Sequence, residues 1–219
     1  MNARRVAVAL VLLALAASTA AQAETATAGT PTFHASISTI GPKIRARMVS
    51  WHKGCPVPIS RLRLLQLDHW GFDGKVHRGR LIVHQDSARA MRRVMHKLFD
   101  NGFKIRQMWL VDAYGASDDR SMAADNTSAF NCRPVAGTSR WSEHAYGRAI
   151  DINPVENPYV SGSHVSPERG RRYANRSLRA KGMVHAGDKT VRAFAAEGWG
   201  WGGAWSGPRD YQHFSASGR

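Results

Sequence analysis

The chain has 219 residues, with 31 Lys and Arg against 16 Asp and Glu, and a formal net charge of +15 at pH 7. This length fits a single domain with a proper core, and no apolar stretch is long enough to cross a bilayer comfortably. The basic balance indicates a polyanionic partner, for which cell-wall polymers, lipid headgroups and nucleic acid all qualify.

The first residues have the pattern of a targeting sequence. Two arginines precede an unbroken apolar run over residues 6–17, and Ala21-Gln22-Ala23 supplies a small-x-small cleavage pattern. This predicts a secretory signal peptide over residues 1–23, with an uncleaved N-terminal anchor as the alternative. We therefore expect the mature chain, Glu24–Arg219, to be secreted or periplasmic.

The next residues predict a leader and then a single folded unit. Residues 25–39 are rich in Ala, Thr, Ser and Gly and show no period, so residues 24–40 are predicted to be a flexible leader. Residues 41–219 contain no internal repeat and are predicted to form one domain. The two cysteines, Cys55 and Cys132, are expected to form a disulfide in an oxidising compartment. A metal site at this pair is disfavoured, because neither cysteine belongs to a Cys-x-x-Cys or Cys-x-x-His cluster.

The first half of the domain predicts a hairpin followed by a helix. Apolar runs over residues 62–67 and 81–84 indicate two strands, separated by the turn signal Asp73-Gly74. Asp86 is expected to cap a helix that runs to about Asp100, because apolar residues recur there at helical spacing and Asn101-Gly102 follows.

The second half predicts shorter elements. Residues 104–114 alternate as a strand, and residues 115–138 are polar and typical of a loop. Helices are predicted from Ser166-Pro167-Glu168 to about Ala180 and over Asp188–Glu197, where Gly198 ends the second. Together these patterns predict an α+β fold, with a small, mostly antiparallel sheet, flanking helices and a metal site on the sheet.

The stretch WSEHAYGRAIDINP, residues 141–154, concentrates residues of chemical interest. We expect His144 in a turn, a bend at Gly147 and a strand over residues 148–153. Asp151 then lies between two isoleucines, and a buried carboxylate there is costly unless it is paired or binds a cation.

A third ligand should lie elsewhere in the chain, and His213 in PRDYQHF is the best candidate. The other eight histidines have no acidic companion at a matching spacing. Asp210 and His213 would face opposite ways in one regular strand. Asp210 is therefore expected in the turn that starts the strand, where it could reach a water without being a ligand.

These residues carry a resemblance to peptidase family M15, the zinc D,D-peptidases and L-alanyl-D-glutamate peptidases of the bacterial cell wall. The motif Ser-x-His-x-x-Gly-x-Ala-x-Asp is present at Ser142, His144, Gly147, Ala149 and Asp151, and the closing motif at Asp210, His213 and Phe214. The Trp-Gly block of residues 198–205 is also similar to the family's. The resemblance implies that His144, Asp151 and His213 bind Zn²⁺ and that Asp210 is the catalytic base.

Such a site has a recognisable chemistry. Two neutral imidazoles and one carboxylate leave a Zn²⁺ ion an open position for water, whose pKa the metal lowers to roughly 7. Asp210 would accept the water proton and pass it to the leaving amine. By the resemblance an upstream arginine assists; Arg133 is favoured because the Cys132 disulfide would hold it, and Arg120 is the alternative.

The sequence therefore predicts an exported zinc metallopeptidase that hydrolyses an amide bond in peptidoglycan stem peptides. The bond is either the terminal D-alanyl-D-alanine link or an internal L-alanyl-D-glutamate link, and the sequence does not choose. We expect a monomer without stable membrane insertion. A non-catalytic zinc-containing wall-binding module is the main alternative, but retention of Asp210 argues against it. A nucleic-acid partner is not expected, because no aromatic-basic interleaving is present.

Overall fold

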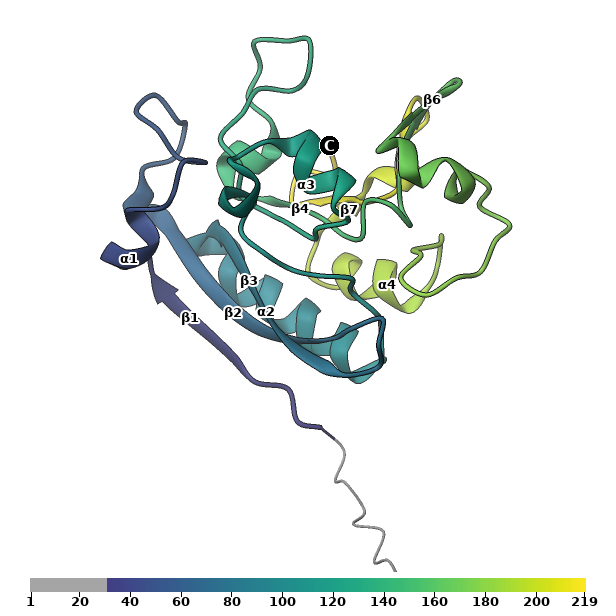
Figure 1. Cartoon of the computed structure of the whole chain (residues 1–219), viewed down its shortest axis with the longest axis horizontal. Helices are drawn as coiled ribbons and strands as arrows, with labels where there is room; N and C mark the ends of the chain where they lie inside the picture. Colours follow the sequence, from purple (N-terminus) through teal and green to yellow (C-terminus); the bar gives the residue numbers. More distant parts are fainter. Residues whose placement is uncertain (1–30) are drawn as a thin grey trace, which may run out of the picture. The chain divides into compact units, whose positions relative to one another are not determined.

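The computed structural model describes residues 31–219, which form one unit (Figure 1). The predicted signal peptide and the first residues of the predicted leader lie outside the described residues. The prediction of a flexible leader up to residue 40 is wrong over its last part, because Ala35–Thr39 forms strand β1 and pairs antiparallel with β2.

Three small antiparallel sheets and flanking helices make up the described part of the chain, which confirms the predicted α+β class. The sheets have the strand orders β1-β2-β3, β4-β9-β7 and β6-β5-β8. The remaining strands are β2 (Leu62–Trp70), β3 (Val76–His84), β4 (Ala149–Asp151), β5 (Tyr159–Ser161), β6 (His164–Ser166), β7 (Gly200–Trp201), β8 (Arg209–Asp210) and β9 (His213–Ser215). The α-helices are α1 (Pro42–Arg45), α2 (Gln85–Asp100), α3 (Asp118–Ala123) and α4 (Lys189–Ala195). Short 3-10 helices are η1 (Ile59–Arg61), η2 (Val111–Tyr114), η3 (Glu143–Tyr146), η4 (Glu168–Ala174) and η5 (Gly202–Ala204).

The predicted hairpin and its helix are confirmed. β2 and β3 pair over their whole lengths, and α2 packs against them (Figure 1). The apolar stripe of α2, including Met91, Met95 and Leu98, is buried against the inward side chains of the two strands. The predicted cap is wrong by two residues: His84 is the N-cap, and its Nδ1 accepts from the backbone N–H of Asp86 at 3.3 Å.

Three predicted elements differ from the structure. Residues 104–114 make only isolated bridges, at Lys104 and Gln107, and end in η2, because no neighbouring strand runs alongside them for a full ladder. The predicted loop over residues 115–138 contains α3, which Ser117 caps through its side chain. The helix predicted after Pro167 is the short η4, which ends at Ala174.

One hydrophobic cluster joins the β2–β3 hairpin and α2 to the sheet β4-β9-β7. Ile150 of β4, Ile152 directly after β4 and Phe214 of β9 belong to this cluster. The ring of Phe214 stacks on Phe194 of α4, with centroids 3.9 Å apart. Side chains alternate between the two faces of a strand, so the residues next to these apolar ones point away from the core. Asp151 and His213 are such residues, and both lie on the face that points away from this cluster.

The predicted disulfide is present between Cys55 and Cys132. It joins the segment before η1 to the segment that leads towards η3, across 77 residues of sequence. No helix within residues 31–219 is long and apolar enough to span a membrane.

The disulfide should contribute measurably to stability. We expect the double variant Cys55→Ala/Cys132→Ala to lose about 2–4 kcal/mol of unfolding free energy, because the crosslink restricts the unfolded chain. Urea denaturation of both proteins measures this difference. Reduced wild type should match the variant, and equal stability of oxidised wild type and variant would contradict the prediction.

Candidate metal centre

His144 is positioned by a capped 3-10 turn. Ser142 is the N-cap of η3, and its hydroxyl accepts from the backbone N–H of His144 at 3.3 Å. Gly147 ends the turn with φ +66°, a left-handed conformation that favours glycine. The Gly147 carbonyl then accepts from the backbone N–H of His84 at 2.8 Å, which ties the turn to the end of β3. The prediction of a turn and a bend at these positions is confirmed.

Asp151 and His213 face each other across two paired strands. Asp151 of β4 is the direct antiparallel partner of His213 of β9, so both side chains leave the sheet on the same face. The other edge of β4 pairs with Ser128 through two backbone hydrogen bonds of 2.9 and 3.1 Å. The β4 strand is shorter than predicted, because Asn153 adopts φ +44° and leaves the ladder.

The two imidazoles have their outer nitrogens fixed by main-chain oxygens. His144 Nδ1 donates to the Ala129 carbonyl at 2.5 Å, and His213 Nε2 donates to the main-chain oxygen of Arg219 at 3.1 Å. A carbonyl oxygen can only accept, so each outer nitrogen carries the proton. When the rings are neutral, the inner nitrogens, His144 Nε2 and His213 Nδ1, therefore present lone pairs.

Three acceptor groups converge on one point. His144 Nε2 and His213 Nδ1 lie 3.2 Å apart, and each lies 3.2 Å from an oxygen of Asp151. Two ligand atoms on a tetrahedral Zn²⁺ ion with bonds of about 2.0–2.1 Å lie roughly 3.3 Å apart. All three residues are buried. The spacing and chemistry of this trio therefore fit a divalent metal ion.

The charges of the cluster favour a cation at its centre. Burial would raise the pKa of Asp151, but the charges of His144 and His213 and the hydrogen bonds to both outweigh it and hold the pKa well below its usual range. Burial lowers the pKa of His213, yet the hydrogen bond to Asp151 and its charge outweigh that effect and raise the pKa to about 9. The trio thus contains an ionised carboxylate and binds positive charge, whether a proton or a metal ion.

Asp210 lies beside the trio but outside it. It belongs to β8, which pairs with β5, so it does not lie in a turn at the start of β9 as predicted. Tyr211 and Gln212 form the bend that separates it from His213. Its Oδ1 is buried without a hydrogen-bond partner among residues 31–219. Burial and the nearby charge of Asp151 raise the pKa of Asp210 to about 7.

The Trp-Gly block supplies the wall around His213. Trp199 and Trp201 are buried in the core, whereas Trp205 is half-buried with its ring 5.6 Å from that of His213. A Cβ at position 202 would lie 2.6 Å from the carbonyl oxygen of Asp210, so only glycine lets β8 pass this closely. The spacing of the block alone did not reveal this role for Gly202.

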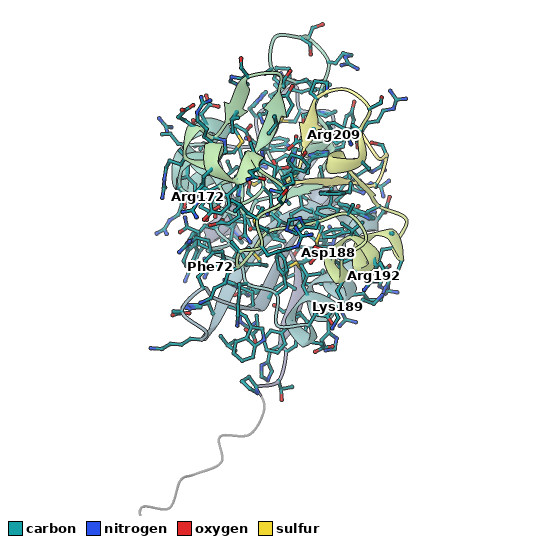
Figure 2. The ribbon with its side chains drawn as sticks, turned by 90° about the vertical axis from the view of Figure 1, so that its right-hand side faces the viewer. Phe72, Arg172, Asp188, Lys189, Arg192 and Arg209 are labelled. Carbon is teal, nitrogen blue, oxygen red and sulfur yellow. A yellow bond between two sulfur atoms is a disulfide. The ribbon has the colours of Figure 1, made fainter. Side chains whose placement is uncertain are left out.

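The two candidate arginines have different surroundings. Arg133 is half-buried, bonds to Asp118 at 2.6 Å and keeps a buried Nε without a partner among the described residues. Its carbonyl accepts from the backbone N–H of Ser142, which links it to the His144 turn. Arg120 is exposed and donates to the Tyr114 carbonyl instead. Arg209, labelled in Figure 2, is a further exposed arginine directly before Asp210.

The groups that orient the site from behind are mainly backbone atoms. The Ala129 carbonyl and the main chain of Ser128 carry no side-chain signal, so no sequence pattern could have identified them. Asn153 could have been noticed, since it shares the alternation of Asp151. Its side-chain amide donates to the carbonyls of Lys104 and Gly182 and so anchors the end of β4.

A second group of potential ligands, His52, Cys55 and Cys132, also lies close together. The two sulfur atoms are joined in the disulfide and offer no thiolate to a metal. Among the described residues, the trio around Asp151 is therefore the stronger metal site.

The region that contains the site is similar to a known protein family. Residues 136–216, just over a third of the sequence, match the M15 family model described as D-alanyl-D-alanine carboxypeptidase. The match supports assignment of the chain to the M15 peptidases. It spans Ser142 to Phe214 and so includes every residue of the two quoted motifs. No curated protein and no solved structure matches the chain.

The M15 motif glycine should be sensitive to substitution. A Cβ at Gly147 would lie 2.5 Å from the backbone nitrogen of His84, and φ is positive there. We expect Gly147→Ala to lose at least the roughly 1–3 kcal/mol typical of a strained backbone position, measured by urea unfolding. Gly207→Ala is the matched control, because nothing lies within 4 Å of a Cβ there. Equal stability of the two variants would contradict this account of the turn.

Proposed function

We propose that the chain is an exported zinc peptidase that hydrolyses an amide bond in the peptide stems of peptidoglycan. The family match supports a peptidase related to D-alanyl-D-alanine carboxypeptidases. The observation that carries the metal part of the proposal is the convergence of His144, Asp151 and His213 with 3.2 Å spacings. These three side chains would hold the ion.

The protein side chains divide the remaining work. A bound Zn²⁺ supplies water activation and polarisation of the amide carbonyl. Asp210 accepts the proton of the attacking water and passes it to the leaving amine. Its buried, unpartnered Oδ1 suits a group that must take up and release a proton. Asp210 is not one of the three residues whose potential ligand atoms all lie within 4.8 Å of one another, so in this scheme it is not a ligand.

Arg133 is the proposed electrostatic partner of the substrate. Its backbone is bonded to the turn that carries His144, and the neighbouring Cys132 is held by the disulfide. Its guanidinium would supply positive charge for the developing oxyanion or for a substrate carboxylate. Pairing with Asp118 offsets part of its charge and fixes the direction of the guanidinium.

Export and substrate class rest on separate features. The signal-peptide pattern of residues 1–23 and the disulfide both suit an oxidising compartment outside the cytoplasm. Without Arg4 and Arg5 of the signal peptide the formal net charge falls from +15 to +13, which suits a protein that works on an anionic wall. The scissile bond is either the terminal D-alanyl-D-alanine link or the L-alanyl-D-glutamate link.

Metal binding should be visible in thermal stability. We expect saturating zinc to stabilise the metal-stripped wild type, by about 2.7 kcal/mol at a free concentration 100 times the Kd. His144→Ala should lose this effect, because it removes one ligand. His164→Ala, at an exposed position of β6, is the matched control and should keep it. Calorimetry with and without zinc measures the shift in thermal stability. A wild type whose stability does not change with zinc would contradict the proposed metal site.

Catalysis should depend on the Asp210 carboxylate and not on its shape. We expect Asp210→Asn to lose about 10²–10⁴-fold in kcat, the range typical of general acid–base catalysis, while its zinc affinity stays near that of the wild type. Asp86→Asn, at the exposed start of α2, should retain full activity. The assay is mass analysis of defined muropeptides, with a chelator-treated sample as the metal-free control.

The same products identify the bond. Loss of the C-terminal D-alanine marks the carboxypeptidase, whereas separation of the muramyl-L-alanine part from the rest of the stem peptide marks the endopeptidase. Wild type that binds zinc but cleaves neither link would instead support a non-catalytic wall-binding module. Unchanged turnover in Asp210→Asn would overturn the proposed role of that carboxylate.

A further inference from the structure

The main-chain oxygen of Arg219 collects three donors from the segment that precedes it. It accepts from His213 Nε2 at 3.1 Å, from the Ser215 hydroxyl at 2.7 Å and from the Ser217 hydroxyl at 3.4 Å. Ser215 is fully buried in β9. The side chain of Arg219 is exposed and takes no part in these bonds. The chain therefore folds back so that a backbone oxygen, and not a side chain, contacts the imidazole.

The segment that carries this oxygen is held at two further points. The backbone N–H of Ala216 donates to the Arg148 carbonyl at 2.9 Å, beside β4. The indole Nε1 of Trp205 donates to the Gly218 carbonyl at 2.8 Å. Figure 1 shows this end of the chain inside the outline of the molecule, near β4 and β7. Two anchors on different elements thus fix where the Arg219 oxygen lies.

We propose that residues 216–219 form a positioning segment for His213. The Arg219 oxygen holds the proton on Nε2 and sets the ring orientation, so that Nδ1 points at Asp151 and His144. Hydrogen bonds to the outer nitrogen of a ligating imidazole orient the ring, and their loss typically lowers metal affinity about 10- to 100-fold. This inference rests on the proposed metal site and adds to it a residue with no metal-binding side chain.

His144 has an equivalent contact to a main-chain oxygen, that of Ala129. The Ala129 carbonyl performs the same task for His144, but it lies between Ser128 and Phe130, whose backbones bond to β4 and β3. The Arg219 oxygen has no such neighbouring strands among the described residues and depends on Trp205 and Ser215. The orientation of His213 can therefore be changed by substitutions outside the hydrophobic core, whereas that of His144 cannot.

The test is a pair of variants that separate the oxygen from the side chain. Removing residues 217–219 takes away the acceptor but keeps the Ala216 bond to Arg148, whereas Arg219→Ala keeps the acceptor. Zinc Kd at fixed pH is measured by competition with a chromophoric chelator, and the Tm of each metal-free protein is measured in parallel. We expect the shortened chain to bind zinc about 10- to 100-fold more weakly and Arg219→Ala to bind within about twofold of wild type.

A third variant guards against a shortened chain that fails to fold. Ser215→Ala removes one donor from the Arg219 oxygen inside an intact strand and should weaken zinc binding in the same direction by a smaller factor. A purely structural segment would lower the Tm of the metal-free shortened protein and leave its zinc Kd at the wild-type value. That result, or equal Kd values for wild type and Ser215→Ala, overturns the inference. A wild type that binds no zinc overturns the metal site itself and is recognised before any variant is compared.

Discussion

The register between β4 and β9 is the constraint on which the site depends. A shift of one residue would place Asp151 opposite Phe214 and send His213 into the core. That shift is prevented by apolar burial, because Ile150, Ile152 and Phe214 occupy the core face and are fully buried. The polar trio is thus aligned by the residues that alternate with it. Packing energy, which greatly exceeds what any single hydrogen bond contributes, sets the geometry of the chemistry.

The trio carries a cost that a bound proton or a metal ion relieves. Three buried acceptors that face one another with neither between them are unfavourable in a protein interior. The structure tolerates them here because both outer nitrogens are satisfied by main-chain oxygens and β4 is bonded along both edges. Asp210 is in a related position, since its buried oxygen has no partner among the described residues. Unsatisfied groups of this kind are rare and gather where a protein binds or reacts.

Sequence patterns predicted the parts of the molecule that local physics determines. The hairpin, helix α2, helix α4 and the turn at Gly147 follow from period, capping and the need for glycine at positive φ. The disulfide followed from counting cysteines. For the trio, the carboxylate between two isoleucines and the Asp210/His213 spacing suggested candidates, and the resemblance to the M15 motifs implied their role as ligands.

Other features depended on contacts that no local pattern contains. Residues 104–114 alternate like a strand but find no neighbour for a full ladder, so tertiary context decided against the pattern. Asp210 was expected in a turn because one regular strand could not present it with His213; the chain instead uses two strands in different sheets. The oxygens of Ala129 and Arg219 are main-chain atoms, which every residue possesses, and only the folded structure distinguishes them.

The separation of the ligands along the chain also governs when the site can exist. His213 follows Asp151 by 62 residues, and β9 is the central strand of its sheet, between β4 and β7. A growing polypeptide emerging from the ribosome contains His144 and Asp151 long before their partner has been made. Until then β4 has no β9 to pair with, and only two of the three proposed ligands are present. Docking of β9 is therefore the step that completes the proposed centre, and a product that ends before His213 cannot contain all three proposed ligands.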